Sequence, residues 1–513
     1  MVTRRQWLGA VTLLAASGWA PSSAQVTGGY GIPRVSLPDF PDGDVLAGSR
    51  PGATWSQLLT MSSLLNMTPE GRVTGGLALA WTLSANRMQL DLVIRIDALF
   101  SNGTRILPRD VFASVIDARE RHSNSLEMWR WERCESVELT PEGVIRFALN
   151  EPDASFFTLL TSRWIPVVPA AWISQGWDRQ TGPFPPASGC FKLETRSEDR
   201  LRFSRNDGYY QVGRPRLAGI ICNAPVGIIP RTTDLVTNGV DLLIDVPLLD
   251  VPLLREDPGV LVVGGPSNQL CLLAVNLRSA TAADPRLRRL LSRAIDREEL
   301  VRAATAGEAT AASTLIHGDH WAGLDARIDL TDPADVRDQL DALGNPPGIE
   351  LRLIASEVDA SLANAGVLLQ EQLAWAGIAL SLDFLNEAEM DEEMAGADWD
   401  LTMRYTPYWD DPHELVRPLL VSDAPGNVGS FRNQRLDDLV GLANRARDNE
   451  NRGRLYRIIQ EIVLDQAPVI PLFFPNYYDA MRTRLQDYPF HSPISAAAMS
   501  QATMSRPEPV ERP

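Results

Sequence analysis

The stretch "LAVNLRSATAADPRLRRLLSRAIDREELV", residues 273–301, joins an apolar run to a polar loop and then to a run with helical spacing. The apolar run predicts a strand, and the proline at position 285 predicts the start of a helix. The apolar side chains of that helix share one face: Leu287, Leu290, Leu291, Ala294 and Ile295. A strand followed by an amphipathic helix is typical of an α/β unit, so we expect an α/β lobe to begin here.

The pattern on either side of this stretch extends the prediction. Downstream, strand-like and helix-like runs alternate over residues 349–355, 363–385, 399–405 and 435–466. A strand-like run interrupted by prolines, "APVIPLFFPNYYDAMRTRL", follows at residues 467–485. Upstream, the chain from about Cys134 is rich in strands separated by charged turns, which favours antiparallel sheet. The sequence therefore predicts an α/β protein with more than one lobe.

Composition narrows the class of partner. The chain has 513 residues and a formal net charge of −17, and Lys192 is its only lysine. A negative surface repels phosphate backbones, so nucleic acid is excluded as a partner. The length is sufficient for two or three hydrophobic cores.

The N-terminus carries an export pattern. Arg4 and Arg5 precede an apolar run of roughly a dozen residues, too short to span about 30 Å of hydrocarbon. Small residues follow and end at Ala24. This predicts a cleavable export signal of the twin-arginine type over residues 1–24 and a periplasmic mature protein, reaching the membrane only through a partner.

The four cysteines, Cys134, Cys190, Cys222 and Cys271, lack C-x-x-C spacing. A thiolate metal site is therefore not expected. Cys190 and Cys222 lie in neighbouring strand-like stretches, so a disulfide between them and two buried free thiols are both open alternatives.

Motifs of catalysis are missing from the sequence. It has no G-x-S-x-G, no H-E-x-x-H, no P-loop and no G-x-G-x-x-G after a strand. Asp410 and Asp411 are adjacent, and adjacent side chains usually point apart, which argues against an acid/base pair. We therefore expect no enzyme activity, no catalytic residue and no cofactor.

Four stretches, in order, resemble the large solute-binding proteins of ABC importers, extracellular solute-binding protein family five. They are residues 77–115, 188–222, 273–301 and 467–474. The matching positions are Trp81, Phe100, Asn102, Gly103, Asp110 and Val111, then Arg205, Asn206, Tyr209, Gly213, Pro215, Leu217 and Ile220, then Asn276, Asp284, Arg286, Arg288, Ala294, Ile295, Asp296 and Arg297. The resemblance covers nearly the whole mature chain.

This resemblance implies a two-lobed periplasmic binding protein, type II and cluster C-like, with an extra subdomain in the first lobe. The implied divisions are a first lobe over 25–265 with its extra subdomain at about 45–170, a second lobe over 266–475, and a return segment with a polar tail over 476–513. The two crossings of the chain, near Gly265 and Pro475, would form the hinge. Ligand would be enclosed between the lobes.

The resemblance also gives candidate ligand contacts around "YTPYWDDPHE", residues 405–414. Peptide-binding members keep an aspartate four residues before the proline, where this chain has Tyr408, which argues against ordinary peptides as cargo. Nickel-binding members have an arginine at the position of Arg404, and arginines near Arg121 and Arg163 that hold the carboxylates of a chelate. We therefore expect an anion clamp of Arg404, Arg121 and Arg163, aromatic walls from Tyr405, Tyr408 and Trp409, and Asp410 as a cation partner.

Metal ligation by the protein itself is not expected. The loop after the motif, "VSDAPG", lacks the histidine that touches metal in nickel-binding members. His317 and His320 have a spacing that suits a metal but no carboxylate or thiolate cluster beside them, and a surface loop is the simpler interpretation.

These observations favour the receptor of an ABC importer. It would bind a small peptide-like or carboxylate-bearing solute and deliver it to a membrane permease with separate ATPase subunits. The alternatives are a receptor for a nickel or other metal chelate and a non-transport interaction or chaperone protein with the same fold. We expect a monomer.

Overall fold

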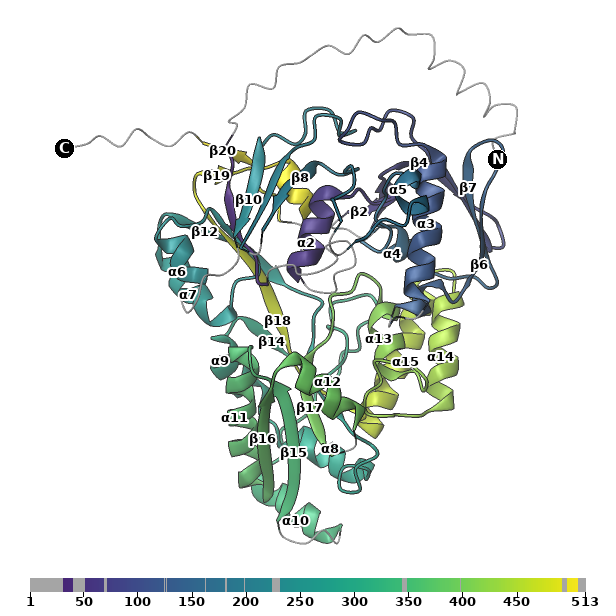
Figure 1. The fold of residues 1–513 in the computed structure, drawn as a ribbon. Coiled ribbons are helices and arrows are strands. Elements are labelled where there is room, and N and C mark those ends of the chain that lie inside the picture. Colours follow the sequence, from purple (N-terminus) through teal and green to yellow (C-terminus); the bar gives the residue numbers. More distant parts are fainter. Residues whose placement is uncertain are drawn as a thin grey trace, which may run out of the picture.

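The computed structural model describes residues 31–39, 51–68, 72–123, 125, 127–161, 163–179, 182–197, 199–223, 231–343, 348–396, 398–490 and 496–505. The predicted export signal over residues 1–24 and nearly all of the polar C-terminal end lie outside these ranges. The described chain folds as two α/β lobes with the long strand β18 (Val469–Arg482) running through the middle of the molecule (Figure 1). The predicted fold class is confirmed.

The second lobe is built on a mixed sheet in the order β16-β15-β17-β13-β18. Strand β15 is parallel to β16 and β17, whereas β13 is antiparallel to β17 and β18. The strands are β13 (Cys271–Val275), β14 (Ala309–Ala311), β15 (Ile349–Ser356), β16 (Ile378–Leu385) and β17 (Leu401–Tyr405). The helices are α8 (Pro285–Ala294), α9 (Arg297–Thr305), α10 (Pro333–Ala342), α11 (Ala360–Trp375), α12 (Glu387–Ala395), α13 (Pro412–Leu420), α14 (Gln434–Arg445) and α15 (Asn449–Gln466).

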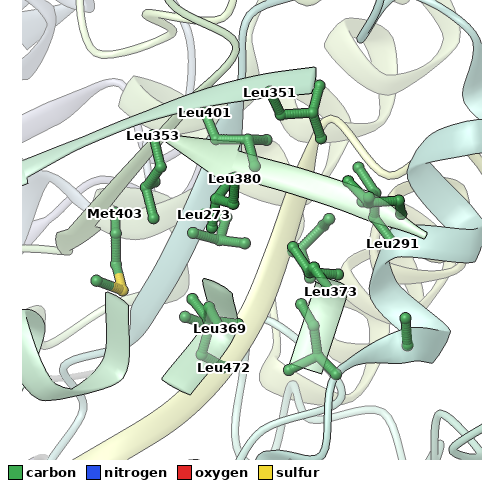
Figure 2. Packing of buried hydrophobic residues seen from close by; sticks show 14 of the residues in the cluster. Leu273, Leu291, Leu351, Leu353, Leu369, Leu373, Leu380, Leu401, Met403 and Leu472 are labelled. Atoms are coloured by element: carbon green, nitrogen blue, oxygen red, sulfur yellow. The ribbon is translucent and has the colours of Figure 1, made fainter. Parts of the chain in front are cut away.

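Both faces of this sheet are covered. One face packs against α8, α9 and α11, where Leu273 of β13, Leu353 of β15 and Leu369 of α11 meet in a leucine-rich core (Figure 2). The other face carries Leu272 and Ala274, which pack against α13, α14 and α15. Because a strand presents alternate residues to opposite faces, a continuous apolar run such as β13 is buried on both sides.

The stretch that predicted this lobe forms β13 followed by two helices rather than one. Helix α8 ends at Ala294, Ile295 has extended backbone, and Asp296 caps α9 by accepting a hydrogen bond from the Glu299 backbone N–H at 3.0 Å. An aspartate at an N-cap satisfies an otherwise unpaired donor of the helix. The expectation of one helix through Ile295 is therefore wrong, because a helix boundary lies between Ala294 and Arg297.

Two arginines of the same stretch serve the fold. Arg288 is buried and donates to the carbonyl oxygens of Gln466 at 2.6 Å and Ala467 at 3.1 Å, which end α15. Arg297 is buried and donates to the carbonyl oxygen of Pro471 in β18 at 2.8 Å. Buried carbonyls need such donors, so these motif residues join α8 and α9 to the end of the chain.

The first lobe has a sheet in the order β18-β11-β1-β10-β9-β8, and β12 pairs with the other edge of β18. Its strands are β1 (Arg34–Ser36), β8 (Phe191–Arg196), β9 (Arg200–Arg205), β10 (Gly219–Asn223), β11 (Leu242–Leu243) and β12 (Val260–Pro266). Its other elements are α2 (Pro51–Thr60), α6 (Arg231–Val236), η2 (Leu248–Asp250), α7 (Val251–Glu256), β19 (Leu485–Gln486), η3 (Ala496–Ser500) and β20 (Thr503–Met504).

A separate antiparallel sheet, β4-β5-β7-β6, lies beside the first lobe with its own hydrophobic cluster between Leu64 and Val167. We call this unit the extra subdomain. Its elements are β2 (Leu65–Met67), β3 (Val73–Gly75), β4 (Ala78–Leu83), β5 (Gln89–Ile94), α3 (Pro108–His122), η1 (Met128–Trp131), β6 (Cys134–Leu139), β7 (Val144–Leu149), α4 (Phe156–Thr161) and α5 (Ala170–Ser174).

Strand β18 belongs to both lobes. Its first half pairs with β13 and β14 of the second lobe, and its second half pairs with β11 and β12 of the first. Pro266 lies opposite Asn476, so the two predicted crossings are adjacent in this ladder. The exact lobe boundaries at 265 and 475 stay a prediction.

All four cysteines are buried free thiols, so the structure contains no Cys190–Cys222 disulfide. Burial raises the pKa of Cys134 to about 11 and that of Cys190 to about 12. Since the thiolate is the reactive form, we expect no thiol to react with an aromatic disulfide reagent in the native protein. In denaturant without reductant, four thiols per chain should react. A count of two under those conditions would mean that a disulfide had formed.

Candidate functional site

The carboxyl ends of the three parallel second-lobe strands, β15, β16 and β17, face the first lobe. Helix α12, which follows β16, lies on the side of the second lobe toward the first lobe, whereas α10, which precedes β15, lies at the far end (Figure 1). In open α/β sheets, ligands bind outside the carboxyl ends of the strands. The loops after β15 and β17 are therefore the second-lobe part of the candidate site.

The loop after β17, residues 406–411, is tied to the chain that leaves β12. The backbone N–H of Leu270 donates to the Thr406 hydroxyl at 3.0 Å, and the Thr406 backbone N–H donates to the Leu270 carbonyl at 2.8 Å. The Asn268 side-chain amide donates to the Trp409 carbonyl at 3.1 Å. This loop is thus held next to the crossing between the lobes.

The acidic residues of the loop divide into a structural and an accessible one. Asp411 caps α13, accepting from the His413 backbone N–H at 2.9 Å, and it binds the buried Arg452 guanidinium through both carboxylate oxygens at 2.6 and 2.8 Å. The side chain of Asp410 is exposed to solvent. Its carboxyl group is nevertheless surrounded by protein atoms, and this desolvation raises its pKa to about 6. The negative charge of the nearby Glu414 is the second cause of the rise. A carboxylate that is both accessible and surrounded suits ligand contact.

The three predicted aromatic walls occupy different places. Tyr405 packs toward the leucine-rich core and contacts Phe473 with ring centroids 6.2 Å apart. Tyr408 lies edge-on to Tyr477 of β18 at 5.5 Å. Trp409 is 4% exposed and packs in the core under α13 to α15 with His320, 5.2 Å away. This placement favours packing over ligand contact for Trp409.

Arg404 is a half-buried cation on β17. Its Nη2 donates to the Gly426 carbonyl at 3.1 Å, and its buried Nε has no partner among the described residues. Burial lowers the pKa of its guanidinium. Because consecutive strand residues point to opposite faces, Arg404 and Tyr405 leave the strand in different directions, and they do not form one wall.

Arg163 and Asp410 both lie near the ion pair of Arg130 with Glu414, which joins the two lobes. Arg163 stacks on Trp164 at 4.4 Å, and Arg130 stacks on the same ring at 4.2 Å. Arg130 forms a buried ion pair with Glu414 of α13, whose charge also acts on both Arg163 and Asp410. Burial, and then the charge of Arg130, lowers the pKa of Arg163 to about 10. The Arg163 Nε is buried without a partner among the described residues.

Further contacts join the extra subdomain to α13 and α14. The backbone N–H of Ala154 donates to the Asn444 carbonyl at 2.9 Å, and Arg417 pairs with Glu132 at 3.0 Å. Arg445 pairs with Glu151 at 2.8 Å. With Arg130–Glu414, these contacts form a continuous belt between the lobes, which we call the interlobe belt.

Arg121 does not join this group. Its Nε donates to Asp117 of the same helix at 3.1 Å, and Asp117 also binds Arg179 at 2.5 Å. An arginine already paired with a carboxylate has less to offer an anionic ligand. Arg121 is thus engaged by Asp117 of its own helix, and the three-arginine clamp stays a prediction.

Sequence reasoning missed two carboxylates at the hinge, Asp245 and Asp479. Asp479 lies in β18 and is buried, accepting from the Asp245 backbone N–H at 3.0 Å and from the Tyr488 hydroxyl at 2.8 Å. Asp245 follows β11 and has φ of 56°, a left-handed conformation that aspartate tolerates. A charged residue inside the apolar run of β18 was the available signal in the sequence.

The hinge carboxylates predict a pH dependence for the cargo-free protein. Burial raises the pKa of Asp245 from 3.8 to about 7 and that of Asp479 to about 6. The folded state therefore binds more protons than the unfolded state between the ordinary aspartate pKa of 3.8 and the raised values of about 6 and 7. The free energy of unfolding falls as pH rises through that range. We expect Asp245→Asn to flatten the fall between pH 5 and pH 8 by on the order of 1–2 kcal/mol. Chemical unfolding at several pH values checks this, and equal slopes in both proteins would contradict it.

Metal ligation finds no support among the described residues, which contain no group of three or more His, Cys, Asp or Glu side chains placed to hold an ion. His317 and His320 each accept a backbone N–H through Nδ1, at 3.3 and 3.2 Å. Burial lowers the pKa of His320 to about 4. Both rings also lie against aromatic side chains, which fits a structural role.

Two α/β lobes, joined by the shared strand β18 and with charged side chains facing each other between them, define a binding protein of the two-lobed periplasmic class. No helix of the described chain is long and apolar enough to cross a membrane.

The sequence profile of the bacterial extracellular solute-binding proteins, family 5, matches residues 72–427, and the chain belongs to this family. The glutathione-binding protein GsiB of Escherichia coli K12 is 23% identical over 450 residues, which cover 85% of this chain and 88% of GsiB.

Two solved structures share the fold. AgaA from A. tumefaciens R10 in complex with agropinic acid has a TM-score of 0.82 at 20% identity, covering 93% of this chain and 99% of AgaA. DppA from Helicobacter pylori in complex with the peptide STSA has a TM-score of 0.80 at 18% identity, with the same coverages of 93% and 99%. Family members are the substrate-binding proteins of ABC importers and act outside the cytoplasm, so the interpretation as a transport protein and not an enzyme is confirmed.

Proposed function

We propose that this chain captures a small peptide-like, carboxylate-bearing solute between its lobes in the periplasm and delivers it to a membrane permease with its own ATPase subunits. The observation that carries the proposal is a pair of half-buried guanidinium groups, Arg404 in the second lobe and Arg163 in the extra subdomain. Neither has a carboxylate partner among the described residues, and each has a buried Nε without a hydrogen-bond partner.

Buried charges are normally paired, because an isolated ion loses its hydration without compensation. An anionic ligand supplies that missing partner when it binds. Guanidinium groups suit carboxylates in particular, since their planar donors match two carboxylate oxygens at once. In this proposal, Asp410 contacts a cationic part of the cargo, and Tyr408 contacts its apolar part.

The named relatives fit a cargo of this chemistry. GsiB is a glutathione-binding protein, and glutathione is a small peptide with two carboxylates. AgaA was solved with agropinic acid and DppA with a short peptide. At these identities the relatives support the class of cargo and leave its identity to experiment.

The export signal and the boundaries of the lobes are part of the same proposal. Residues 1–24 act as a cleavable export signal, and residues 25–265, 266–475 and 476–513 form the first lobe, the second lobe and the returning segment. Opening and closing then take place about the paired strands β12 and β18, which carry both crossings.

The test is mass spectrometry of the ligand released from gently purified protein, with metal analysis of the same sample. We expect a small molecule with at least one carboxylate and no stoichiometric metal. A tightly held metal in a one-to-one ratio would instead assign the protein as a chelate receptor. A released ligand without any anionic group would overturn the proposal.

A further inference from the structure

A buried histidine lies between the lobes, on helix α13 of the second lobe. His413 is 7% exposed, and its ring meets the ring of Trp129, in η1 of the extra subdomain, edge-on with centroids 5.7 Å apart. The next residue, Glu414, forms the ion pair with Arg130 that joins the lobes, and Arg130 stacks on Trp129 at 4.4 Å. Helix α13 faces the extra subdomain (Figure 1). Trp129 therefore covers the His413 ring only while the lobes are together.

One nitrogen of the His413 ring lacks a hydrogen-bond partner. Its Nδ1 is buried and makes no hydrogen bond with the described residues. The nearby Asp411 accepts from the His413 backbone N–H rather than from the ring, and both of its carboxylate oxygens bind Arg452. A neutral imidazole donates through one nitrogen, whereas a protonated imidazole donates through both. A proton added to His413 in this closed form would therefore leave a buried N–H without an acceptor, which costs free energy.

The charged groups around His413 are carboxylates and arginines that pair with each other. They come from α13 and the loop before it, from α15 and from the extra subdomain. The recorded pairs are Asp411–Arg452, Glu414–Arg130, Glu127–Arg130, Glu132–Arg417 and Glu151–Arg133. Asp410, on the same loop as Asp411, is exposed to solvent. Burial, followed by the charges of these four arginines, lowers the pKa of His413 well below 6.5.

We propose that His413 makes the closing of the lobes depend on pH, because its imidazole takes up a proton when the lobes part and releases it when they close. In the open form water reaches the ring, and histidine in water titrates near pH 6.5. The open form therefore binds one more proton below that pH, so acid favours the open form and neutral pH favours the closed form. This inference rests on the proposed function, in which closing holds the cargo, and adds a control on its release.

A second buried histidine provides a comparison, because its contacts stay within one lobe. His122, at the end of α3, is 8% exposed, and its Nδ1 accepts a hydrogen bond from the Trp131 Nε1 at 2.9 Å. Its recorded ring contacts are with Trp131 and Trp164, both in the extra subdomain. These neighbours move together with His122 when the lobes part. Its protonation is therefore not coupled to closing.

The first test measures opening by small-angle scattering of the cargo-free protein at pH 7.0 and pH 5.0. We expect the radius of gyration of the native protein to increase at pH 5.0. His413→Phe should respond less, because phenylalanine keeps a ring against Trp129 and takes up no proton. His413→Gln is a second variant with the same expected result. The control is His122→Asn, whose amide oxygen can accept from Trp131, and it should respond as the native protein does.

The second test measures the affinity for glutathione by calorimetry at the same two pH values. The carboxyl, amino and thiol groups of such a peptide titrate mainly outside this range. A histidine that titrates near 6.5 only in the open form weakens binding by at most about 25-fold between pH 7.0 and pH 5.0. We expect the loss of affinity at pH 5.0 to be about 10-fold larger in the native protein than in His413→Phe.

The outcomes separate the inference from the proposed function. If the native protein and His413→Phe respond equally to pH in scattering and in glutathione binding, His413 does not control closing, and the proposed function stands. If glutathione binds at neither pH while scattering shows opening that depends on His413, the proposed peptide-like cargo is contradicted and the control of closing by His413 is supported. Circular dichroism at both pH values confirms that each variant folds.

Discussion

Replacing Arg404 by alanine is expected to weaken binding of the co-purified cargo by about 100-fold or more. The guanidinium is half-buried on β17 with one hydrogen bond to the Gly426 carbonyl and no carboxylate partner among the described residues. A cargo carboxylate that pairs with it in a dry site contributes far more than a surface ion pair. Calorimetry with the identified cargo measures the loss.

The same substitution should leave the cargo-free protein at least as stable. Burial lowers the pKa of Arg404, which means that the folded chain holds this charge at a cost. Removing it relieves that cost, so the unfolding temperature without cargo is expected to stay level or rise. Arg435→Ala, an exposed arginine on α14, is the control and should change neither quantity. If Arg404→Ala binds the cargo as tightly as the native protein does, Arg404 does not contact the cargo.

Replacing Arg130 by alanine is expected to shift the protein toward an open form. Arg130 and Glu414 form an ion pair across the lobes with side chains only 10% and 8% exposed, and Arg130 lies between the rings of Trp129 at 4.4 Å and Trp164 at 4.2 Å. Breaking one side of a buried pair costs about 3–5 kcal/mol, and that cost falls on the closed form, in which the pair exists.

The measurements are small-angle scattering and cargo affinity. A smaller closed fraction enlarges the radius of gyration and lowers apparent affinity in proportion, so we expect about 10-fold to 100-fold weaker binding. Arg417→Ala is the matched comparison, because Arg417–Glu132 also joins the lobes but Glu132 is about half exposed. An exposed pair contributes about 0.2–1 kcal/mol, so its loss should be nearly silent. Identical scattering from native protein and Arg130→Ala would rule out the interlobe belt as a closing contact.

Much of the fold was readable because its signals are local. The strand and the amphipathic helix of residues 273–301 depend on neighbours a few residues away. The break between α8 and α9 also had a local signal, an aspartate at 296 followed by Glu299, whose backbone N–H it binds. The apolar residues Leu287 and Ile295 obscured this helix boundary, because their spacing fits one face of a single continuous helix.

The candidate site was less readable because its contacts join distant parts of the chain. Arg130 and Glu414 are 284 residues apart, and Asp245 and Asp479 are 234 residues apart. Nothing in the sequence near Arg130 indicates that it pairs with Glu414. Conversely, the resemblance to nickel-binding members suggested a ligand contact for Arg121, yet α3 itself supplies Asp117 as its partner. The spacing of residues within one segment indicates which side chains could bind a ligand, whereas their ion-pair partners are known only from the fold.

Strand β18 also fixes the order in which the chain can finish folding during synthesis. Residues 476–482 lie between β11 and β12 in the first-lobe sheet, yet the ribosome makes them after the entire second lobe. The lobe that is started first is therefore the last to be completed, and a nascent chain that stops before residue 469 leaves open edges in both lobes at once. Neither lobe is complete without β18, and this one strand closes both sheets.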